Sequence, residues 1–511
     1  MGYFRRNPSQ SGGEIPITEM IENKQQDQIT VKPESRRRNR IELALPLERL
    51  EKVSSWGGAS SSLSYVYRPS TVDKLGQVFD LARRSGHTVG LRGAGNSYGD
   101  ATLNSENITL DFRRMNRILD WNPTSGRIRV EPGVTIAQLW QYVIEDGWWP
   151  PVVPGTAKPT LGGSAGMNIH GKNAWKSGTI GEHIIEFQLL LPGGQIVTCS
   201  PEQNPDLFYG AIGGFGMLGV FTSITLEMHR IYSGLLKVEA LVSRNLGEMF
   251  EQFEQLLPES DYLVGWIDGY AAGKGLGRGQ IHKANYLAPE ADPYPSQSLR
   301  LENQHLPDTL FGFFPRSFIW RLMRPAMNDF GARFVNSVKY LSSRLGHGSI
   351  FLQPHVAFHF LLDYIPNWKG SYGSGGLIQY QCFIPAENAQ ETIRQVLLLC
   401  QKRGLRNYLS VLKRHRRDKF LISHGVDGYS LAMDFRITPH RRPKIVKLAS
   451  ELDQIVVTAG GRFYLAKDST LNPDIVQSYL GSDTINSFWE LKRRTDPDQI
   501  LQTNLWRRLF Y

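Results

Sequence analysis

The stretch Gly90-Leu-Arg-Gly-Ala-Gly-Asn-Ser-Tyr-Gly-Asp100 says most about the fold of this 511-residue chain. Its glycines remove Cβ atoms where backbone N–H groups can approach an anionic ligand closely. A second glycine-rich stretch runs from Pro154 to Asn173 and includes Leu161-Gly-Gly-Ser-Ala-Gly166. Two such loops suit a ligand with a diphosphate group, and their flanking residues lack the pattern of a Rossmann unit. We therefore predict that the loops form a flavin (FAD) site.

Short strands and helices alternate around these loops. Residues 88–92 and 127–131 have the pattern of strands, and Ser70 is expected to cap an amphipathic helix. Residues 184–191 and 195–199 are separated by Pro-Gly-Gly and are predicted to form a hairpin. This alternation is typical of α+β or α/β chains.

The pattern changes near residue 235, where the frequent glycines stop. Residues 262–268, 377–384 and 429–434 read as strands, and a helix is expected at about 388–403. These features indicate a second, mostly antiparallel sheet backed by helices.

The length of the chain favours two domains over one core. We predict an α+β fold in which residues 46–235 and 456–511 form the FAD-binding domain. Residues 236–455 are expected to form the substrate-binding domain. Residues 1–45 are too polar to bury a core and are expected to be a disordered tail.

The net charge of +10 is compatible with nucleic acid, a membrane surface or an anionic substrate. Basic clusters at 36–40, 413–417 and 441–444 are predicted to be solvated faces. No nucleic-acid motif accompanies them, so no nucleic-acid partner is expected. The stretch 311–342 mixes arginines with aromatic residues such as Phe313 and is predicted to meet a membrane surface.

Cysteine usage and hydropathy bear on the compartment. The three cysteines show neither metal-ligand nor disulfide spacing, so we expect a reducing compartment and no metal. The N-terminus has no apolar signal segment, and no apolar run is long enough to span a bilayer. A cytoplasmic protein is predicted, with peripheral contact at the inner face of the membrane.

Several polar residues near the loops are candidates for chemistry. His170 and Lys172 share a side if their segment is extended, although a lone histidine is more often a core residue. Gln379 and Gln381 alternate on one strand, so they can contact sugar hydroxyls or bond across strands. A lysine at 467 buried beside a flavin would have a lowered pKa, whereas a surface ion pair of Lys467 with its neighbour Asp468 is the alternative.

Motifs along most of the chain resemble those of the vanillyl-alcohol-oxidase, or PCMH-type, superfamily of FAD-binding oxidoreductases. Within it the chain resembles the decaprenylphosphoryl-β-D-ribose 2-oxidases from residue 50 onward. The matching motifs are Ser55-Trp-Gly57, Asn96-Ser-Tyr-Gly-Asp100, Val153-Pro-Gly-Thr156, Ile169-His-Gly-Lys-Asn173, Trp266 with Asp268, Gly277-Arg278, Gln379-Tyr-Gln381, Ala466-Lys-Asp-Ser469, and Arg493-Arg494 with Asp496-Pro497.

The loops and this resemblance together imply a set of site residues. The expected FAD contacts are Arg92, Gly93, Ala94, Gly95, Asn96, Ser97, Tyr98, Pro154, Gly155, Thr156, Gly162, Gly163, Gly166, His170, Lys172, Asn173, Gly178, Gly219 and Tyr464. The expected sugar pocket contains Tyr98, His170, Lys172, Trp266, Gln379, Gln381 and Lys467. By the resemblance, Lys467 lies next to the reacting carbon and His170 lies nearby.

Two positions depart from the pattern of these relatives. Those with covalently bound flavin carry a histidine in the first loop where this chain has Asn96, so we predict non-covalent FAD. The ribose oxidases carry a cysteine in a pocket strand where this chain has Ala432. The change removes a thiol but is expected to leave the chemistry intact.

The resemblance implies oxidation of a sugar hydroxyl by hydride transfer to flavin N5, with Lys467 and His170 as the catalytic residues. The expected substrate is the 2-hydroxyl of a polyprenyl-phosphoryl ribose or a similar glycosyl phospholipid. A short-chain reductase that reduces the keto product is the expected partner. Two alternatives stay open: oxidation of a sugar-1,4-lactone, and a non-catalytic flavin-binding scaffold.

Overall fold

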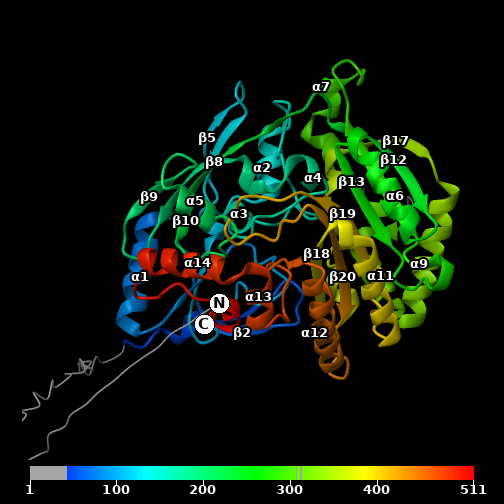
Figure 1. The fold of residues 1–511 in the computed structure, drawn as a ribbon. Coiled ribbons are helices and arrows are strands. Elements are labelled where there is room, and N and C mark those ends of the chain that lie inside the picture. Colours follow the sequence, from blue (N-terminus) through cyan, green and yellow to red (C-terminus); the bar gives the residue numbers. More distant parts are fainter. Residues whose placement is uncertain (1–42, 307, 311–313) are drawn as a thin grey trace, which may run out of the picture. The chain divides into compact units, whose positions relative to one another are not determined.

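The computed structural model describes residues 43–306, 308–310 and 314–511, and Leu43–Tyr511 form one compact unit (Figure 1). Most of the predicted tail, including the basic cluster at 36–40, lies outside the described residues, as does Phe313. Leu45 is buried against the first sheet and its helix.

The first sheet has four strands in the order β1-β2-β4-β3. Its strands are β1 (Leu50–Ser54), β2 (Ser61–Tyr67), β3 (Val89–Arg92) and β4 (Ile108–Asp111). β4 pairs in parallel with both β2 and β3, and α1 (Val72–Ser85) packs on them. The predicted cap at Ser70 was wrong by one residue. Thr71 has extended backbone and accepts a hydrogen bond from the Lys74 amide, so it caps α1.

The second sheet has five antiparallel strands in the order β5-β6-β10-β8-β9. They are β5 (Ile118–Asn122), β6 (Arg127–Val130), β8 (Ile184–Leu190), β9 (Ile196–Cys199) and β10 (Val220–Glu227). β8 and β9 form the predicted hairpin. The second glycine loop connects α2 (Ile136–Val143) to this sheet through the short helices α3 (Leu161–Gly166) and α4 (Ala174–Ser177).

The third sheet has eight strands, and every pairing in it is antiparallel, as predicted for this region. Its order is β17-β12-β14-β13-β19-β20-β18-β21. The strands are β12 (Leu235–Ser243), β13 (Tyr262–Ile267), β14 (Gly279–Tyr286), β17 (Ser349–Pro354), β18 (Leu377–Pro385), β19 (Leu409–His415), β20 (Gly428–Arg436) and β21 (Arg462–Phe463). The mixed α and β content and the antiparallel sheets confirm the α+β class.

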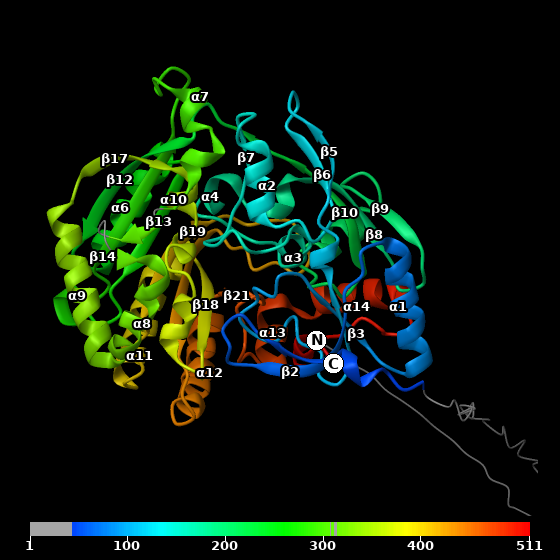
Figure 2. The same cartoon turned by 180° about the vertical axis from the view of Figure 1, so that it is seen from behind.

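Helices cover the two faces of the eight-stranded sheet differently. α6 (Leu246–Leu256), α11 (Ala386–Lys402) and α12 (Arg442–Thr458) pack on one face, and α11 is the helix expected at 388–403. α9 (Asp329–Leu345) covers the other face beside β12 and β14, preceded by α8 (Arg316–Ala326) (Figure 2). No helix among the described residues is both long and apolar enough to cross a bilayer.

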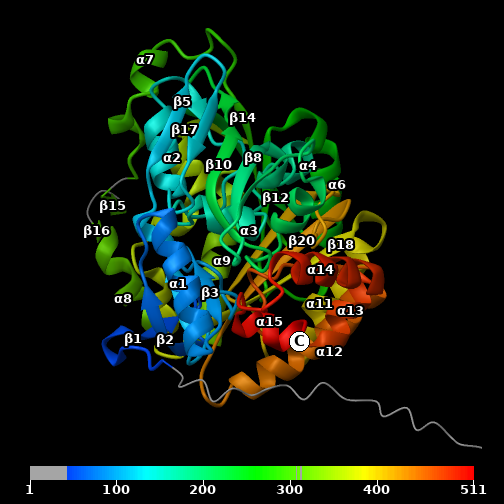
Figure 3. The ribbon, with the colours of Figure 1, turned by 90° about the vertical axis from the view of Figure 1, so that its left-hand side faces the viewer.

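The C-terminal segment returns to the first sheet. It contains α13 (Pro473–Leu480), α14 (Ser482–Thr495) and α15 (Asn504–Leu509). The Val89 amide donates to the Ile500 carbonyl at 2.7 Å, and the Gln502 amide donates to the Val89 carbonyl at 3.0 Å. These bonds bring α15 close to β3 (Figure 3).

Candidate active site

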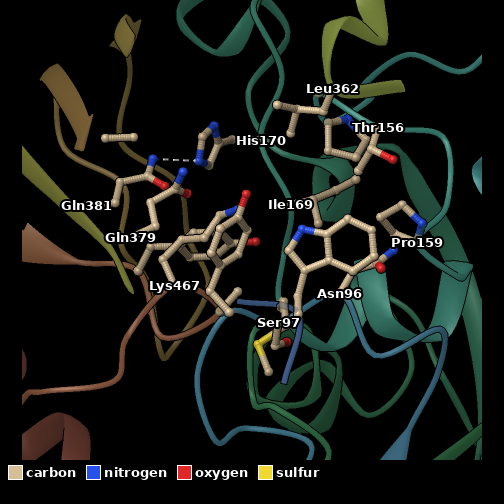
Figure 4. Close-up of a pocket in the computed structure, with 18 of the residues that line it drawn as sticks. Asn96, Ser97, Thr156, Pro159, Ile169, His170, Leu362, Gln379, Gln381 and Lys467 are labelled. Carbon is tan, nitrogen blue, oxygen red and sulfur yellow. Dashed lines mark hydrogen bonds between the residues drawn. The ribbon is translucent and has the colours of Figure 1, made fainter. Parts of the chain in front are cut away.

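A cavity of about 790 Å³ lies between the two glycine loops and one face of the eight-stranded sheet (Figure 4). Most of the predicted site residues line it. They are Arg92, Gly93, Ala94, Gly95, Asn96, Ser97, Tyr98, Pro154, Gly155, Thr156, Gly162, Gly163, Gly166, His170, Lys172, Trp266, Gln379, Gln381, Tyr464 and Lys467. The fold therefore brings most of the expected FAD contacts and the whole expected sugar pocket to one cavity.

Three expected FAD contacts do not line the cavity. The Asn173 amide group donates to the Pro151 carbonyl at 2.9 Å, inside the wall. Gly178 ends α4 with φ 72°, and a Cβ there would lie 1.8 Å from Glu182 Oε1. Gly219 packs so closely on β8 that a Cβ would lie 2.7 Å from Leu189 Cγ. The structure gives these three residues a role in packing rather than at the cavity surface.

The loop wall, residues 92–98 and 154–170, is shaped by backbone at positions that exclude side chains. A Cβ on Gly93 would lie 2.0 Å from Thr160 Oγ1, and one on Gly162 would lie 2.7 Å from Pro132 Cβ. Gly95 has φ 69°, and its Cβ would lie 2.1 Å from Arg92 Nη2. These contacts explain why glycine occupies these positions.

Polar groups of the loop wall fit a dinucleotide. Both polar atoms of the Asn96 side chain are buried and have no partner among the described residues, so a ligand could satisfy them. The Thr156 hydroxyl, by contrast, donates to Asp363 Oδ1 at 2.8 Å. The Thr156 hydroxyl is therefore less available to the cofactor than predicted, because it already donates its hydrogen bond to Asp363.

The sheet wall is a row of side chains in direct register across five strands. Gln381 of β18 is paired with Ala432 of β20, and Ala432 is paired with Val411 of β19. Val411 is paired with Trp266 of β13, which in turn faces Gln280 of β14. All five line the cavity, because side chains opposite one another in a sheet lie on the same face.

His170 joins the loop wall to the sheet wall. Gln381 Nε2 donates to His170 Nε2 at 3.0 Å (Figure 4). The imidazole therefore accepts at Nε2 and carries its proton on Nδ1, which has no partner among the described residues. Burial, with the nearby Lys413, holds the pKa of His170 well below its ordinary value. His170 is a neutral side chain whose Nδ1–H is available to a ligand.

Lys467 lies between the two walls. Its Nζ is 3.8 Å from the centre of the buried Tyr98 ring. Burial lowers the pKa of Lys467 to about 7; Asp434 opposes this effect and Lys413 adds to it. The predicted alternative of a surface ion pair with Asp468 is wrong, because Asp468 pairs with Arg508 instead. A lysine with this pKa is partly neutral at pH 7 and can accept a proton.

Arg508 of α15 fixes the segment that carries Lys467 against the first glycine loop. Its guanidinium binds Asp100 at 2.7 Å and Asp468 at 2.7 Å. The Tyr98 amide donates to the Ala466 carbonyl at 2.8 Å. The two segments therefore cross in direct contact, and Arg508 ties both to the C-terminal helix.

The cavity is strongly cationic. Arg92, Lys172, Lys339, Lys413 and Lys467 line it, and none of its lining residues is a carboxylate. Burial lowers the pKa of both Lys339 and Lys413 to about 8. The Lys172 ammonium donates to the Phe358 carbonyl, and burial, with Lys413 nearby, lowers its pKa well below the ordinary value. This charge suits a ligand that carries several negative groups.

Four contributors to the site were missed from the sequence. Lys413 was assigned to a solvated basic cluster, yet alternation with Val411 along β19 would have placed it on the cavity face. Asp434 accepts a hydrogen bond from Gln379 Nε2 at 2.6 Å, and burial raises the pKa of Asp434 to about 6. The roles of Arg508 and Lys339 depend on contacts between distant segments, and no local pattern indicates them.

Comparisons with known proteins agree with this geometry. Residues 63–200 match the family described as FAD binding domain. The chain is 28% identical to the decaprenylphosphoryl-beta-D-ribose oxidase of Mycolicibacterium smegmatis over 90% of its own length and 97% of that protein. It is 24% identical to the D-arabinono-1,4-lactone oxidase of Yarrowia lipolytica, over 59% of this chain and 56% of that protein. It is 25% identical to the mouse L-gulonolactone oxidase, over 38% of this chain and 43% of that protein.

The protein is therefore an FAD-dependent oxidoreductase, and it resembles the PCMH-type superfamily. The resemblance to the decaprenylphosphoryl ribose oxidases that its motifs predict is confirmed. FAD is its cofactor, and the glycine-shaped loop wall and the unpartnered Asn96 are suited to hold it.

Proposed function

We propose that this protein oxidises the 2-hydroxyl of a polyprenyl-phosphoryl ribose, or of a similar glycosyl phospholipid, to a ketone. The observation that carries the proposal is the basic lining of the cavity: Arg92 and four lysines line it, and none of its lining residues is a carboxylate. The FAD diphosphate accounts for part of this charge. A phosphoryl group on the sugar would pair with the remaining basic side chains, such as Lys413, whereas a neutral sugar lactone would offer them no anionic partner.

The same proposal assigns the two walls to two ligands. Residues 46–235 and 456–511 hold the FAD, and residues 236–455 supply the sheet wall that holds the sugar. Gln379, Gln381 and Trp266 project into the cavity from that sheet and offer amide and aromatic surfaces to sugar hydroxyls and the ring. The oxidised keto sugar is the expected substrate of a separate short-chain reductase.

Oxidation of a carbinol releases a hydride from carbon and a proton from oxygen. When bound, FAD supplies the hydride acceptor. The neutral amine of Lys467 takes the hydroxyl proton, since its pKa of about 7 leaves much of it unprotonated at neutral pH. His170 donates from Nδ1 and orients a ligand oxygen. Burial lowers the pKa of His170, which disfavours this side chain as the proton acceptor.

Oxidation of a sugar-1,4-lactone is the second candidate, because the relatives named above include two aldonolactone oxidases. Those relatives cover a smaller share of the chain than the ribose oxidase does. The cationic cavity is the feature that distinguishes the two substrates.

Product analysis tests the proposal. The holoprotein is incubated with an artificial electron acceptor and either a phosphoryl ribose with a short prenyl chain or D-arabinono-1,4-lactone. We expect the phosphoryl ribose to lose two hydrogens by mass spectrometry and the lactone to stay unchanged. Oxidation of the lactone alone would assign the second function, and oxidation of neither would favour a flavin-binding scaffold.

A further inference from the structure

The helix α9 carries its apolar side chains on the face turned toward solvent. The buried residues of α9 are Ala332, Asn336, Tyr340 and Ser343. Five of its six exposed large apolar residues are Phe330 (83%), Phe334 (64%), Val338 (50%), Leu341 (59%) and Leu345 (87%). Their spacing of three and four residues places them on one stripe. A helix of a soluble protein normally turns this stripe toward the core, so the outer face of α9 requires an explanation.

The apolar surface continues onto the neighbouring elements. α8 exposes Phe318 (48%) and Leu322 (51%), and the edge strand β17 exposes Ile350 (57%) and Leu352 (53%). α8 contacts α9, α9 contacts β12, and β12 pairs with β17, so these elements are contiguous. Figure 2 shows α9 and β17 together at the outer end of the sheet. We call this combined surface of α8, α9 and β17 the apolar face.

The charges around the apolar face are almost all positive. Between Arg316 and Leu345 the chain has six basic residues and one acidic residue, Asp329. Asp329 lies near Arg441 (3.8 Å) and accepts a hydrogen bond from the Tyr270 hydroxyl at 3.1 Å. Just outside this segment, Asp308 lies 3.8 Å from Arg316. Apolar side chains interleaved with mostly basic residues are typical of surfaces that bind the interface of an anionic bilayer.

The apolar face is continuous with the rim of the cavity. Met323 of α8 and Val335, Asn336 and Lys339 of α9 line the cavity as well. Lys339 Nζ lies 4.1 Å from the centre of the Trp266 ring, which belongs to the sheet wall. The same two helices thus present one side to the outside and another side to the site.

We propose that the apolar face docks on an anionic lipid bilayer and that the lipid chain of the substrate enters the cavity between α8 and α9. The route of the chain rests on the proposed function, whereas the docking surface does not. A second copy of this chain would bring like charges together across the face. Residues 1–42 are also a poor occupant of the apolar face. Their basic cluster Arg36-Arg-Arg-Asn-Arg40 would be repelled by the basic residues around that face.

Vesicle co-sedimentation tests the docking surface. The holoprotein is mixed with phosphatidylcholine vesicles, with or without about one third phosphatidylglycerol. The test variant is Phe330→Ser with Leu345→Ser, because both side chains are highly exposed and make little contribution to the core. The matched control is Leu47→Ser, which removes a side chain that is 74% exposed on another part of the molecule.

We expect wild-type protein and the Leu47→Ser control to sediment with the anionic vesicles and much less with the neutral ones. The double variant should bind the anionic vesicles at least about tenfold more weakly than the wild type, because it loses the two most exposed side chains of the apolar stripe. Equal binding by the double variant, or no binding by the wild type, would overturn the proposal. A dimer in sedimentation velocity that the double variant converts to monomer would assign the face to a second copy instead.

Turnover of a short-chain phosphoryl ribose in solution separates this inference from the proposed function. If the wild-type protein oxidises the short-chain substrate but does not bind the vesicles, the proposed docking surface is refuted and the proposed function stands. Vesicle binding that depends on Phe330 and Leu345, without turnover, would refute the proposed function alone.

Discussion

The two walls of the cavity are built by different means. The loop wall comes from two short stretches, 92–98 and 154–170, and its shape depends on backbone and on missing Cβ atoms. The sheet wall comes from strands that lie between Tyr262 and Arg436, and its side chains meet only because the register aligns them. The comparison teaches that the cofactor site is encoded locally, whereas the substrate site is encoded by strand pairing.

Substitution of the base between the walls should have the largest effect. Lys467→Met removes the amine placed over the Tyr98 ring while leaving the loop wall unchanged. We expect a decrease in kcat of about 10²- to 10⁴-fold with normal FAD content. Steady-state turnover and flavin absorbance measure the two quantities. The surface variant Lys176→Met serves as the control, and a similar loss of turnover there would remove the special role of Lys467.

Substitution in the loop wall should affect the cofactor instead. Gly93→Ala places a Cβ 2.0 Å from Thr160 Oγ1, so the first loop must move. Overpacking of this kind costs about 1–3 kcal/mol, which corresponds to FAD binding weaker by roughly ten- to a hundredfold. Fluorescence titration of the apoprotein measures it. Gly76→Ala in α1 has open space around its Cβ and should bind FAD normally.

Loss of the contact that fixes the Lys467 segment to the first glycine loop should have a smaller effect. Arg508→Met leaves Asp100 and Asp468 without their shared partner, so the segment that carries Lys467 becomes less well fixed. We expect kcat to fall about tenfold while KM changes little. Arg508→Lys should restore part of the rate. A positioning role would be contradicted if the Arg508→Met variant unfolds, or if its KM changes while its kcat stays normal.

The charges around Lys467 should shift its pH profile in opposite directions. Because the amine must be neutral, flavin reduction should increase with pH through about 7 in the wild type. Lys413→Met removes a positive neighbour, which raises the pKa of Lys467 and slows the reaction near pH 7. Asp434→Asn removes a negative neighbour and has the reverse effect. Rate changes of about two- to threefold are expected. Shifts of equal sign in both variants would contradict the assignment.

These differences also explain what the sequence could predict. Glycine spacing indicated the loop wall, and alternation placed Gln379 and Gln381 on one face, because both signals depend on neighbouring residues. Lys413 was assigned to solvent, since its basic neighbours concealed the alternation along β19. Arg508 and Asp434 act through partners that are distant along the chain. Gly178 and Gly219 were expected to contact FAD but do not line the cavity. In a sequence, a glycine required for packing cannot be told from a glycine that contacts a ligand.

The central claim is that one cavity joins FAD on the loop wall to a phosphoryl sugar on the sheet wall. Anaerobic mixing of the holoprotein with a short-chain phosphoryl ribose, followed by flavin absorbance, tests it most directly. The account predicts rapid loss of the oxidised flavin band with the phosphoryl ribose and little loss with D-arabinono-1,4-lactone. An unchanged flavin band with the phosphoryl ribose, or bleaching by the lactone alone, would contradict it.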